Sequence, residues 1–186
     1  MDYTKIFAIL SILVIFFFFV WYKTTHIYVV SKIDGKSYKV KNTKLSQESA
    51  DILATVNQRI LKLKGYVEGL DKKPVYTRRL NKYDTGKISE NVLNLGTTYT
   101  LNKKNMYFCL TPRQDDIYVY DINTLMFVAI HELAHISSES VGHTPEFIAN
   151  FKDLVRHGIA AGVYEYVDYR KFPVEYCGMT IKNNVI

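Results

Sequence analysis

The first pattern in the chain is a continuous hydrophobic stretch at residues 6–22, which contains no charged side chain. If this stretch is helical, its 17 residues extend about 25 Å, the low end of what the core of a bilayer requires. Trp21 and Tyr22 close the stretch with side chains that suit a membrane interface. Because no small-x-small cleavage site follows, we expect residues 1–22 to be an uncleaved transmembrane anchor rather than a signal peptide.

A strand-like pattern follows the anchor. Residues 27–42 contain two β-rich runs on either side of Asp34 and Gly35, a dipeptide that favours a two-residue type I′ turn. We therefore predict a basic juxtamembrane hairpin within residues 23–45. That segment carries six Lys and one Asp, whereas residues 46–186 carry 17 Lys and Arg against 16 Asp and Glu.

This distribution changes the interpretation of the net charge of +6. The lysines from Lys23 to Lys44 lie beside the membrane, where each can gain on the order of 1 kcal/mol from anionic lipid, although a solvated basic face explains them equally well. A nearly neutral remainder argues against nucleic acid as a partner. The lysine excess after the anchor predicts a cytoplasmic C-terminal domain. Two cysteines do not suggest a disulfide framework, and we expect Cys177 to be a buried thiol.

Residues 46–186 are long enough for one domain of ordinary size. Hydrophobic residues recur at helical spacing after Ser46, which can cap a helix that Gly65 can end. Residues 65–91 are polar and resemble a loop. Strands are expected from four runs, which are residues 97–101, 106–110, 117–120 and a final strand within 173–181.

The chemistry of the chain is concentrated in a predicted helix at residues 125–137. His131, Glu132 and His135 have the HExxH spacing, which places the two imidazoles on one face of a helix, where they can share one ion. In this arrangement two neutral histidines bind Zn2+, and the adjacent glutamate handles the proton of a water that the metal activates. A catalytic zinc also needs a third protein ligand.

His143 is our prediction for the third ligand. It precedes Thr144 and Pro145, which we expect to be the N-cap and first residue of a helix that runs to about Gly162. From a turn between two helices, this imidazole can reach back to an ion held by the first helix. Because sites with two histidines and one glutamate also exist, three acidic alternatives remain, which are Glu139, Glu146 and Glu165.

Other residues with catalytic chemistry have simpler explanations. His157 is expected on the polar side of the later helix, and His26 beside the membrane. Phenols near the C-terminus could hydrogen-bond an oxyanion, although packing is the commoner role of such rings. The candidates are Tyr164, Tyr166, Tyr169 and Tyr176.

The sequence HELAHISSESVGHTPEF resembles the zincin metallopeptidases of the WLM and SprT-like groups, including relatives encoded by large DNA viruses. The matching residues are His131, Glu132, His135, His143 and Phe147. The resemblance is close over about 20 residues and looser over residues 97–178, and the gap between the second and third histidines is longer than is usual in those groups. It implies an α+β, zincin-like metallopeptidase domain at residues 46–186, with an active-site helix, a small sheet and a bound Zn2+.

These patterns favour a membrane-anchored zinc metallopeptidase that hydrolyses a protein or peptide substrate. Glu132 would then take a proton from the attacking water and pass it to the leaving amine. The strands predicted before the motif could bind an extended peptide by strand addition. The alternative is a catalytically inactive structural membrane protein of a particle or organelle, which keeps the fold without turnover.

Overall fold

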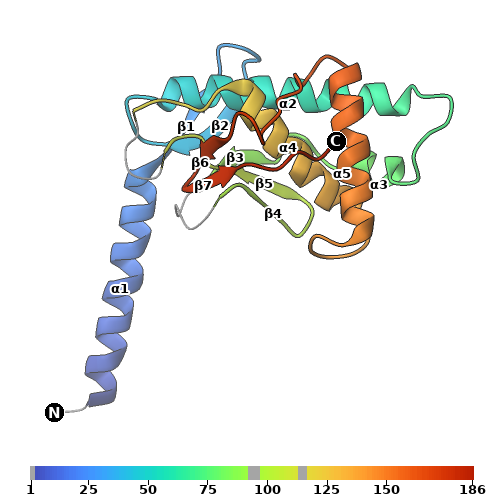
Figure 1. Cartoon of the computed structure of the whole chain (residues 1–186). Coiled ribbons are helices and arrows are strands. Elements are labelled where there is room, and N and C mark those ends of the chain that lie inside the picture. The colour runs from blue at the N-terminus through green and yellow to red at the C-terminus, as the bar shows by residue number, and fades with distance from the viewer. Residues whose placement is uncertain (1–2, 92–96, 113–116) are drawn as a thin grey trace.

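The computed structural model describes residues 3–91, 97–112 and 117–186, and its architecture is α+β. The helices of the described residues are α1 (Tyr3–Thr25), α2 (Ser46–Glu68), α3 (Thr77–Lys82), α4 (Ile122–Ser137) and α5 (Pro145–Ala160). The strands are β1 (His26–Val30), β2 (Ser37–Lys41), β3 (Ile88–Glu90), β4 (Tyr99–Leu101), β5 (Asn105–Phe108), β6 (Val174–Tyr176) and β7 (Met179–Ile181). Figure 1 shows α2 across the top of the domain, with α4 and α5 descending beside the strands.

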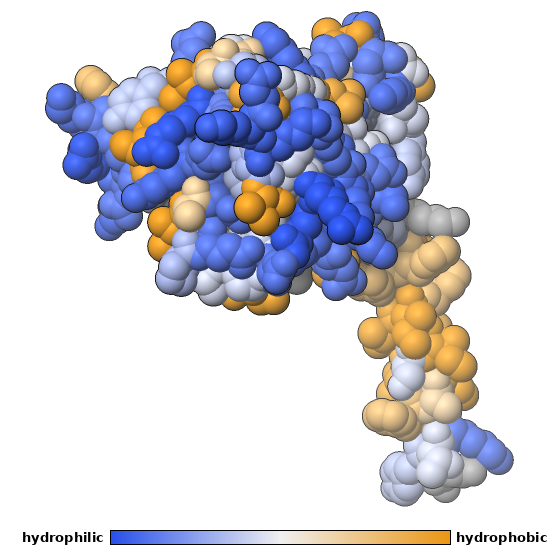
Figure 2. All heavy atoms as spheres, turned by 90° about the vertical axis from the view of Figure 1, so that its right-hand side faces the viewer, coloured by the Kyte–Doolittle hydropathy of each residue, from blue (hydrophilic) through white to orange (hydrophobic). Residues whose placement is uncertain are grey.

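α1 stands apart from the domain as a projecting stalk (Figure 1). No part of its span Tyr3–Tyr22 is buried inside the protein. In Figure 2 this helix is orange, the colour of hydrophobic residues, below a domain surface that is mostly blue. α1 is therefore long and apolar enough to cross a membrane, and it includes the whole of residues 6–22.

The hairpin that the sequence predicts after the anchor is present, but its turn is different. β1 and β2 pair antiparallel over all five residues of each strand, so residues 31–36 form the connection. The expected two-residue type I′ turn at Asp34 and Gly35 is therefore wrong. The loop closes instead on Ser31, whose carbonyl accepts a hydrogen bond of 3.0 Å from the N–H of Gly35, a residue at φ 70°.

α2 is the helix against which the hairpin and the later helices pack. Tyr38 and Val40 of β2 are buried in one core with its apolar stripe, which includes Leu53, Val56, Ile60 and Leu63. Its ends differ from the prediction: Leu45 is the N-cap residue, and the helix continues through Gly65. The Ser46 hydroxyl bonds to carbonyls of the preceding loop and is therefore not available as the cap.

The central sheet has the strand order β3-β5-β4, with β3 parallel and β4 antiparallel to β5. β4 and β5 confirm two of the predicted strands, whereas residues 117–120 form no strand. α3 and β3 lie in residues 65–91, where the pattern indicated only a loop. Both are short, and they are stabilised by tertiary packing, since Leu80 and Ile88 are buried in the common core.

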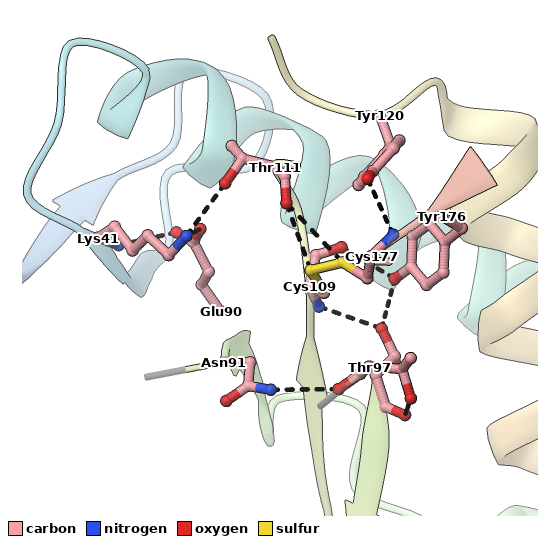
Figure 3. Close-up of a disulfide and its surroundings, with 10 residues drawn as sticks. Lys41, Glu90, Asn91, Thr97, Cys109, Thr111, Tyr120, Tyr176 and Cys177 are labelled. Atoms are coloured by element: carbon pink, nitrogen blue, oxygen red, sulfur yellow. Dashed lines mark hydrogen bonds and ion pairs between the residues drawn. A yellow bond between two sulfur atoms is a disulfide. The ribbon is translucent and has the colours of Figure 1, made fainter. Parts of the chain in front are cut away.

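The predicted final strand is a hairpin that a disulfide fixes to the central sheet. β6 and β7 pair around Cys177 and Gly178, whose φ angles of 49° and 76° suit a two-residue turn. Cys177 is bonded to Cys109, just after β5, so the expected free thiol is wrong. Figure 3 shows this disulfide beside Tyr176 and Tyr120, whose hydroxyl accepts a hydrogen bond of 2.9 Å from the N–H of Cys177.

Removal of the disulfide should destabilise the domain. Cys109 and Cys177 are 68 residues apart, and the closure entropy of such a loop corresponds to about 4 kcal/mol of unfolding free energy. We expect the double variant Cys109→Ser, Cys177→Ser to show a lower melting temperature than the wild type in thermal unfolding of the full-length protein in detergent. A reductant should lower the melting temperature of the wild type only. An equal response of both proteins would contradict the disulfide.

Candidate metal centre

α4 positions the first two histidines on a rigid helix. Its N-cap is Asp121, whose Oδ1 accepts hydrogen bonds of 2.9 Å from the N–H groups of Asn123 and Thr124. With this cap the helix begins at Ile122, three residues before Leu125. Most of the apolar residues of α4 are buried, whereas His131 and His135 lie on a partly open face.

His143 reaches this face from the loop before α5. The Nε2 atom of His131 lies 3.2 Å from Nε2 of His135 and 3.2 Å from Nε2 of His143. A tetrahedral zinc with Zn–N bonds of about 2.0–2.1 Å would hold two nitrogens roughly 3.3 Å apart. Because an imidazole Nε2 carries either one proton or one lone pair, it can form a good hydrogen bond with only one of two such neighbours. The geometry therefore fits three imidazoles that share one cation.

The protonation of the α4 histidines suits a metal. Burial, followed by the neighbouring imidazoles of His135 and His143, lowers the pKa of His131 to about 3. Burial, followed by His143 and Lys103, also lowers the pKa of His135. Both side chains are therefore neutral at physiological pH, which is the state in which histidine binds zinc.

Glu132 is buried beside the cluster, with 5% of its surface exposed. Burial raises the pKa of its carboxyl group to about 7, although the nearby Thr100 acts in the opposite direction. A carboxyl group with this proton affinity can both accept and release a proton near neutral pH. Thr100 belongs to β4, and its contact with Glu132 had no signal in the sequence.

An aromatic ring orients the three imidazoles. Phe147 packs against all of them, with ring centroids 4.2–5.0 Å apart, and Phe151 packs on His131 at 5.0 Å. Phe147 lies in the first turn of α5. As predicted, the N-cap residue of this helix is Thr144, which accepts a hydrogen bond of 3.3 Å from the N–H of Phe147. The start of α5 therefore sets the positions of both the ring and His143.

The loop that carries His143, residues 138–144, is fixed by a carboxylate of α5. Glu146 accepts hydrogen bonds from the backbone N–H groups of Glu139 and Ser140 at 2.7 and 3.0 Å, and from the Ser140 hydroxyl at 2.7 Å. These bonds lower the pKa of Glu146 to about 2. The carboxylate is therefore ionised at physiological pH and acts as an anchor for the loop.

Two cations hold the same loop from outside the α4–α5 unit. Nζ of Lys103, in the turn after β4, donates to the carbonyl oxygens of Ser138, Glu139 and Ser140. Arg79 of α3 forms an ion pair with the Glu139 carboxylate. These contacts join residues 35 to 60 positions apart, so no local pattern in the sequence indicates them.

The structure brings His143 to the other histidines and leaves the acidic alternatives elsewhere. Among the described residues, the candidate ligand atoms of His131, His135 and His143 lie within 4.8 Å of one another, and no carboxylate belongs to this group. Glu139 pairs with Arg79, Glu146 binds the loop, and Glu165 bonds to Asn123 through its backbone.

The other candidate residues lie outside this cluster. His157 is partly buried rather than a simple surface residue, and its Nε2 lies 3.2 Å from a carboxylate oxygen of Asp153. His26 is also buried, with its ring stacked on Tyr22. The Tyr176 hydroxyl donates to the carbonyl of Cys109 at 2.8 Å. Of the other three candidate tyrosines, Tyr164 and Tyr169 are buried and Tyr166 is exposed.

The histidines and Glu132 line a cleft of about 530 Å³. One wall is β4, which pairs with β5 along one edge only, and the opposite wall is formed by residues 140–143. An adjoining cavity of about 340 Å³ extends from His131 toward the β6–β7 hairpin, where Met179 and Ile181 line it. The site can therefore accommodate an extended chain together with an apolar side chain.

Comparison with known proteins finds relatives in viruses. The chain is 34% identical to uncharacterized protein R325 of Acanthamoeba polyphaga mimivirus over 188 residues, which cover 96% of this chain and 95% of that protein. It is 36% identical over 81 residues, 43% of this chain and 44% of the relative, to uncharacterized protein 136R of Invertebrate iridescent virus 6. It is 43% identical over 83 residues, 44% of this chain and 50% of the relative, to uncharacterized protein 042R of Invertebrate iridescent virus 3. No family model and no solved structure matches the chain.

The anchoring role of Glu146 can be tested through metal affinity. The two backbone N–H groups bond to different oxygens of Glu146, and a glutamine would place an NH2 donor at one of these positions, so Glu146→Gln should loosen the loop that carries His143. We expect the affinity for Zn2+, measured by competition with a chromogenic chelator, to fall roughly 10-fold to 100-fold, as is typical when a group that orients a ligand is lost. Glu165→Gln, in which only an alternative ligand is changed, should bind Zn2+ like the wild type. Equal affinity of all three proteins would contradict the role of Glu146.

Proposed function

We propose that this chain, which belongs to the family of uncharacterized protein R325 of Acanthamoeba polyphaga mimivirus, is a membrane-anchored zinc-dependent metallopeptidase. The observation that carries the proposal is the convergence of three imidazole nitrogens beside a buried carboxyl group. His131, His135 and His143 are the donor set of a catalytic zinc, and Glu132 has the position of the general base. A zincin-like fold is part of this proposal, supported by the helix α4 that runs beside the edge strand β4.

The carboxyl group of Glu132 carries out the proton transfers of peptide hydrolysis. A zinc ion bound by the three imidazoles would supply a Lewis acid that polarises the scissile carbonyl and makes water more acidic. Glu132 accepts the proton that the attacking water loses and returns it to the leaving amine. Thr100 of β4 lies near this carboxyl group and lowers its pKa. The aromatic ring of Phe147 restricts the access of bulk water to the imidazoles from the side of α5.

The edge of β4 provides a binding mode for the substrate. Its backbone pairs with β5 on one side, and its other side faces the cleft that contains Glu132. An extended polypeptide can add to such an edge through main-chain hydrogen bonds, which places its carbonyl groups near the histidines. This mode favours a protein or peptide substrate over a small molecule.

In the proposed function, α1 is the membrane anchor. Among the lysines within residues 23–44, Lys39 lies beside the end of α1, with its Nζ 4.0 Å from the centre of the Tyr22 ring, and is suited to anionic lipid. The lysine excess favours a cytoplasmic domain, whereas the Cys109–Cys177 disulfide favours an oxidising compartment. In either orientation the domain follows α1 directly, so the same part of the domain lies next to the bilayer.

The metal assignment predicts a stoichiometric zinc site. Full-length protein purified in detergent should contain about one zinc per chain, measured by elemental analysis. His135→Ala should remove most of the metal because it deletes one of three ligands. His157→Ala, which alters a histidine of α5 outside the cluster, should retain the wild-type zinc content. Zinc below about half an equivalent in the wild type, unchanged by His135→Ala, would refute the metal site.

If Glu132 is the general base, a variant of this residue should retain bound zinc and lose peptidase activity. Glu132→Gln should keep the bound zinc and lose peptide cleavage by roughly 10²-fold to 10⁴-fold, the usual contribution of a general base. A digest of a broad peptide library, read by mass spectrometry, measures this loss, and Glu165→Gln serves as the matched control.

Identical cleavage by wild type and Glu132→Gln would rule out the proposed role of the carboxyl group. A wild type with full zinc and no cleavage of any peptide would favour a structural membrane protein without turnover.

A further inference from the structure

The junction between α1 and the domain is ordered and contains no linker. β1 begins at His26, the residue after the end of α1, and the Asn42 N–H donates a hydrogen bond of 2.8 Å to the carbonyl of Thr25. Tyr22 stacks on His26 with ring centroids 5.7 Å apart and also contacts Lys39 of β2. These contacts fix the direction in which the domain extends from the helix. A bilayer that contains α1 therefore faces one particular side of the domain.

Figure 1 shows which side this is. The turn between β4 and β5 and the loop of residues 138–144 lie at the lower edge of the domain, on the side toward which α1 projects. The loop between β1 and β2, residues 31–36, lies at the opposite edge. The turn and the 138–144 loop both contribute residues that line the cleft, so this part of the cleft lining lies on the membrane side of the domain.

Exposed hydrophobic side chains lie at this part of the domain. Val141 of the 138–144 loop and Tyr99 of β4 line the cleft and are 87% and 38% exposed. Leu101, at the end of β4, is 47% exposed, and Lys104, in the turn that follows, is also exposed. Apolar side chains accompanied by lysine are the composition that binds the interfacial region of a bilayer. We refer to Val141, Leu101, Tyr99 and Lys104 as the cleft rim.

We propose that the cleft rim rests on the lipid surface of the membrane that holds α1. The site then receives polypeptide segments that lie at this surface, such as the juxtamembrane segments of other membrane proteins. The proposal depends on the anchor and the cleft of the proposed function, but it does not depend on zinc or on turnover. It explains why hydrophobic side chains border a cleft that must otherwise be open to water.

Tryptophan fluorescence of the full-length protein in nanodiscs tests this placement. The chain has one tryptophan, so Trp21→Phe provides a background in which Val141→Trp is the only reporter. Lipids with brominated acyl chains should quench its emission roughly twofold relative to ordinary lipids, since an interfacial side chain enters the boundary of the acyl region. The matched control is Ile33→Trp in the same background, which alters an exposed hydrophobic residue in the loop at the opposite edge.

We expect little quenching of Ile33→Trp. Equal quenching of both reporters, or quenching of Ile33→Trp alone, would overturn the proposal. Both sites are exposed in loops, and circular dichroism verifies that both variants are folded. The readout requires neither metal nor substrate, so a negative result with an active enzyme refutes only the placement. Quenching of Val141→Trp in a protein without peptidase activity supports the placement and refutes only the proposed function.

Discussion

The close packing of α5 on α4 is the contact on which the rest of the site depends. Gly158 of α5 lies against Ile130 of α4, and a Cβ at this position would come within 2.8 Å of the Ile130 Cδ1 atom, so the end of that side chain would have to move. At the other end of α5, Phe147 and Phe151 bring aromatic rings against the imidazoles. A shift of α5 along α4 would therefore move His143 away from the other two histidines. The arrangement of the three histidines follows from the packing of two helices as much as from the motif on one of them.

Polar contacts also hold the elements around the site in place. Glu146 of the adjacent helix α5 and Lys103 of the distant β4–β5 turn hold the loop of His143 from two sides. The β6–β7 hairpin is joined to the central sheet by the disulfide and by the Tyr176 hydroxyl, which lies within hydrogen-bonding distance of Thr98. These contacts reduce the freedom of the site before any ligand arrives, and such preorganisation is what a metal site with three ligands requires. The short strands alone are too small to provide it.

The arrangement of anchor and cleft places the proposed chemistry beside the membrane. α1 meets β1 without a linker, and the junction is closed by aromatic and hydrogen-bonding contacts, so the domain has little freedom to rotate. A peptidase held in this way would select substrates by their position at the membrane as well as by their sequence. Lys39 of β2 lies beside Tyr22 at the end of α1, whereas Lys32 and Lys36 lie in the loop at the opposite edge of the domain.

The sequence by itself determined the features that depend on local periodicity and spacing. These are the apolar helix α1, the amphipathic α2, the HExxH helix with its two histidines and Glu132, and the start of α5 at Thr144. Each is encoded within one or two turns of chain, where side-chain pattern and capping act directly. The local patterns were less reliable for turns and short strands: they gave a wrong hairpin turn at Asp34, and no sign of α3 or β3.

Only the tertiary structure decided the features that join distant residues. It brought His143, rather than one of three glutamates, to the α4 histidines, although the sequence gap allowed either. It also paired Cys109 with Cys177 across 68 residues and placed Thr100 against Glu132. The physical reason is that such contacts arise from helix packing and strand order, which depend on the whole core and leave no local pattern in the chain.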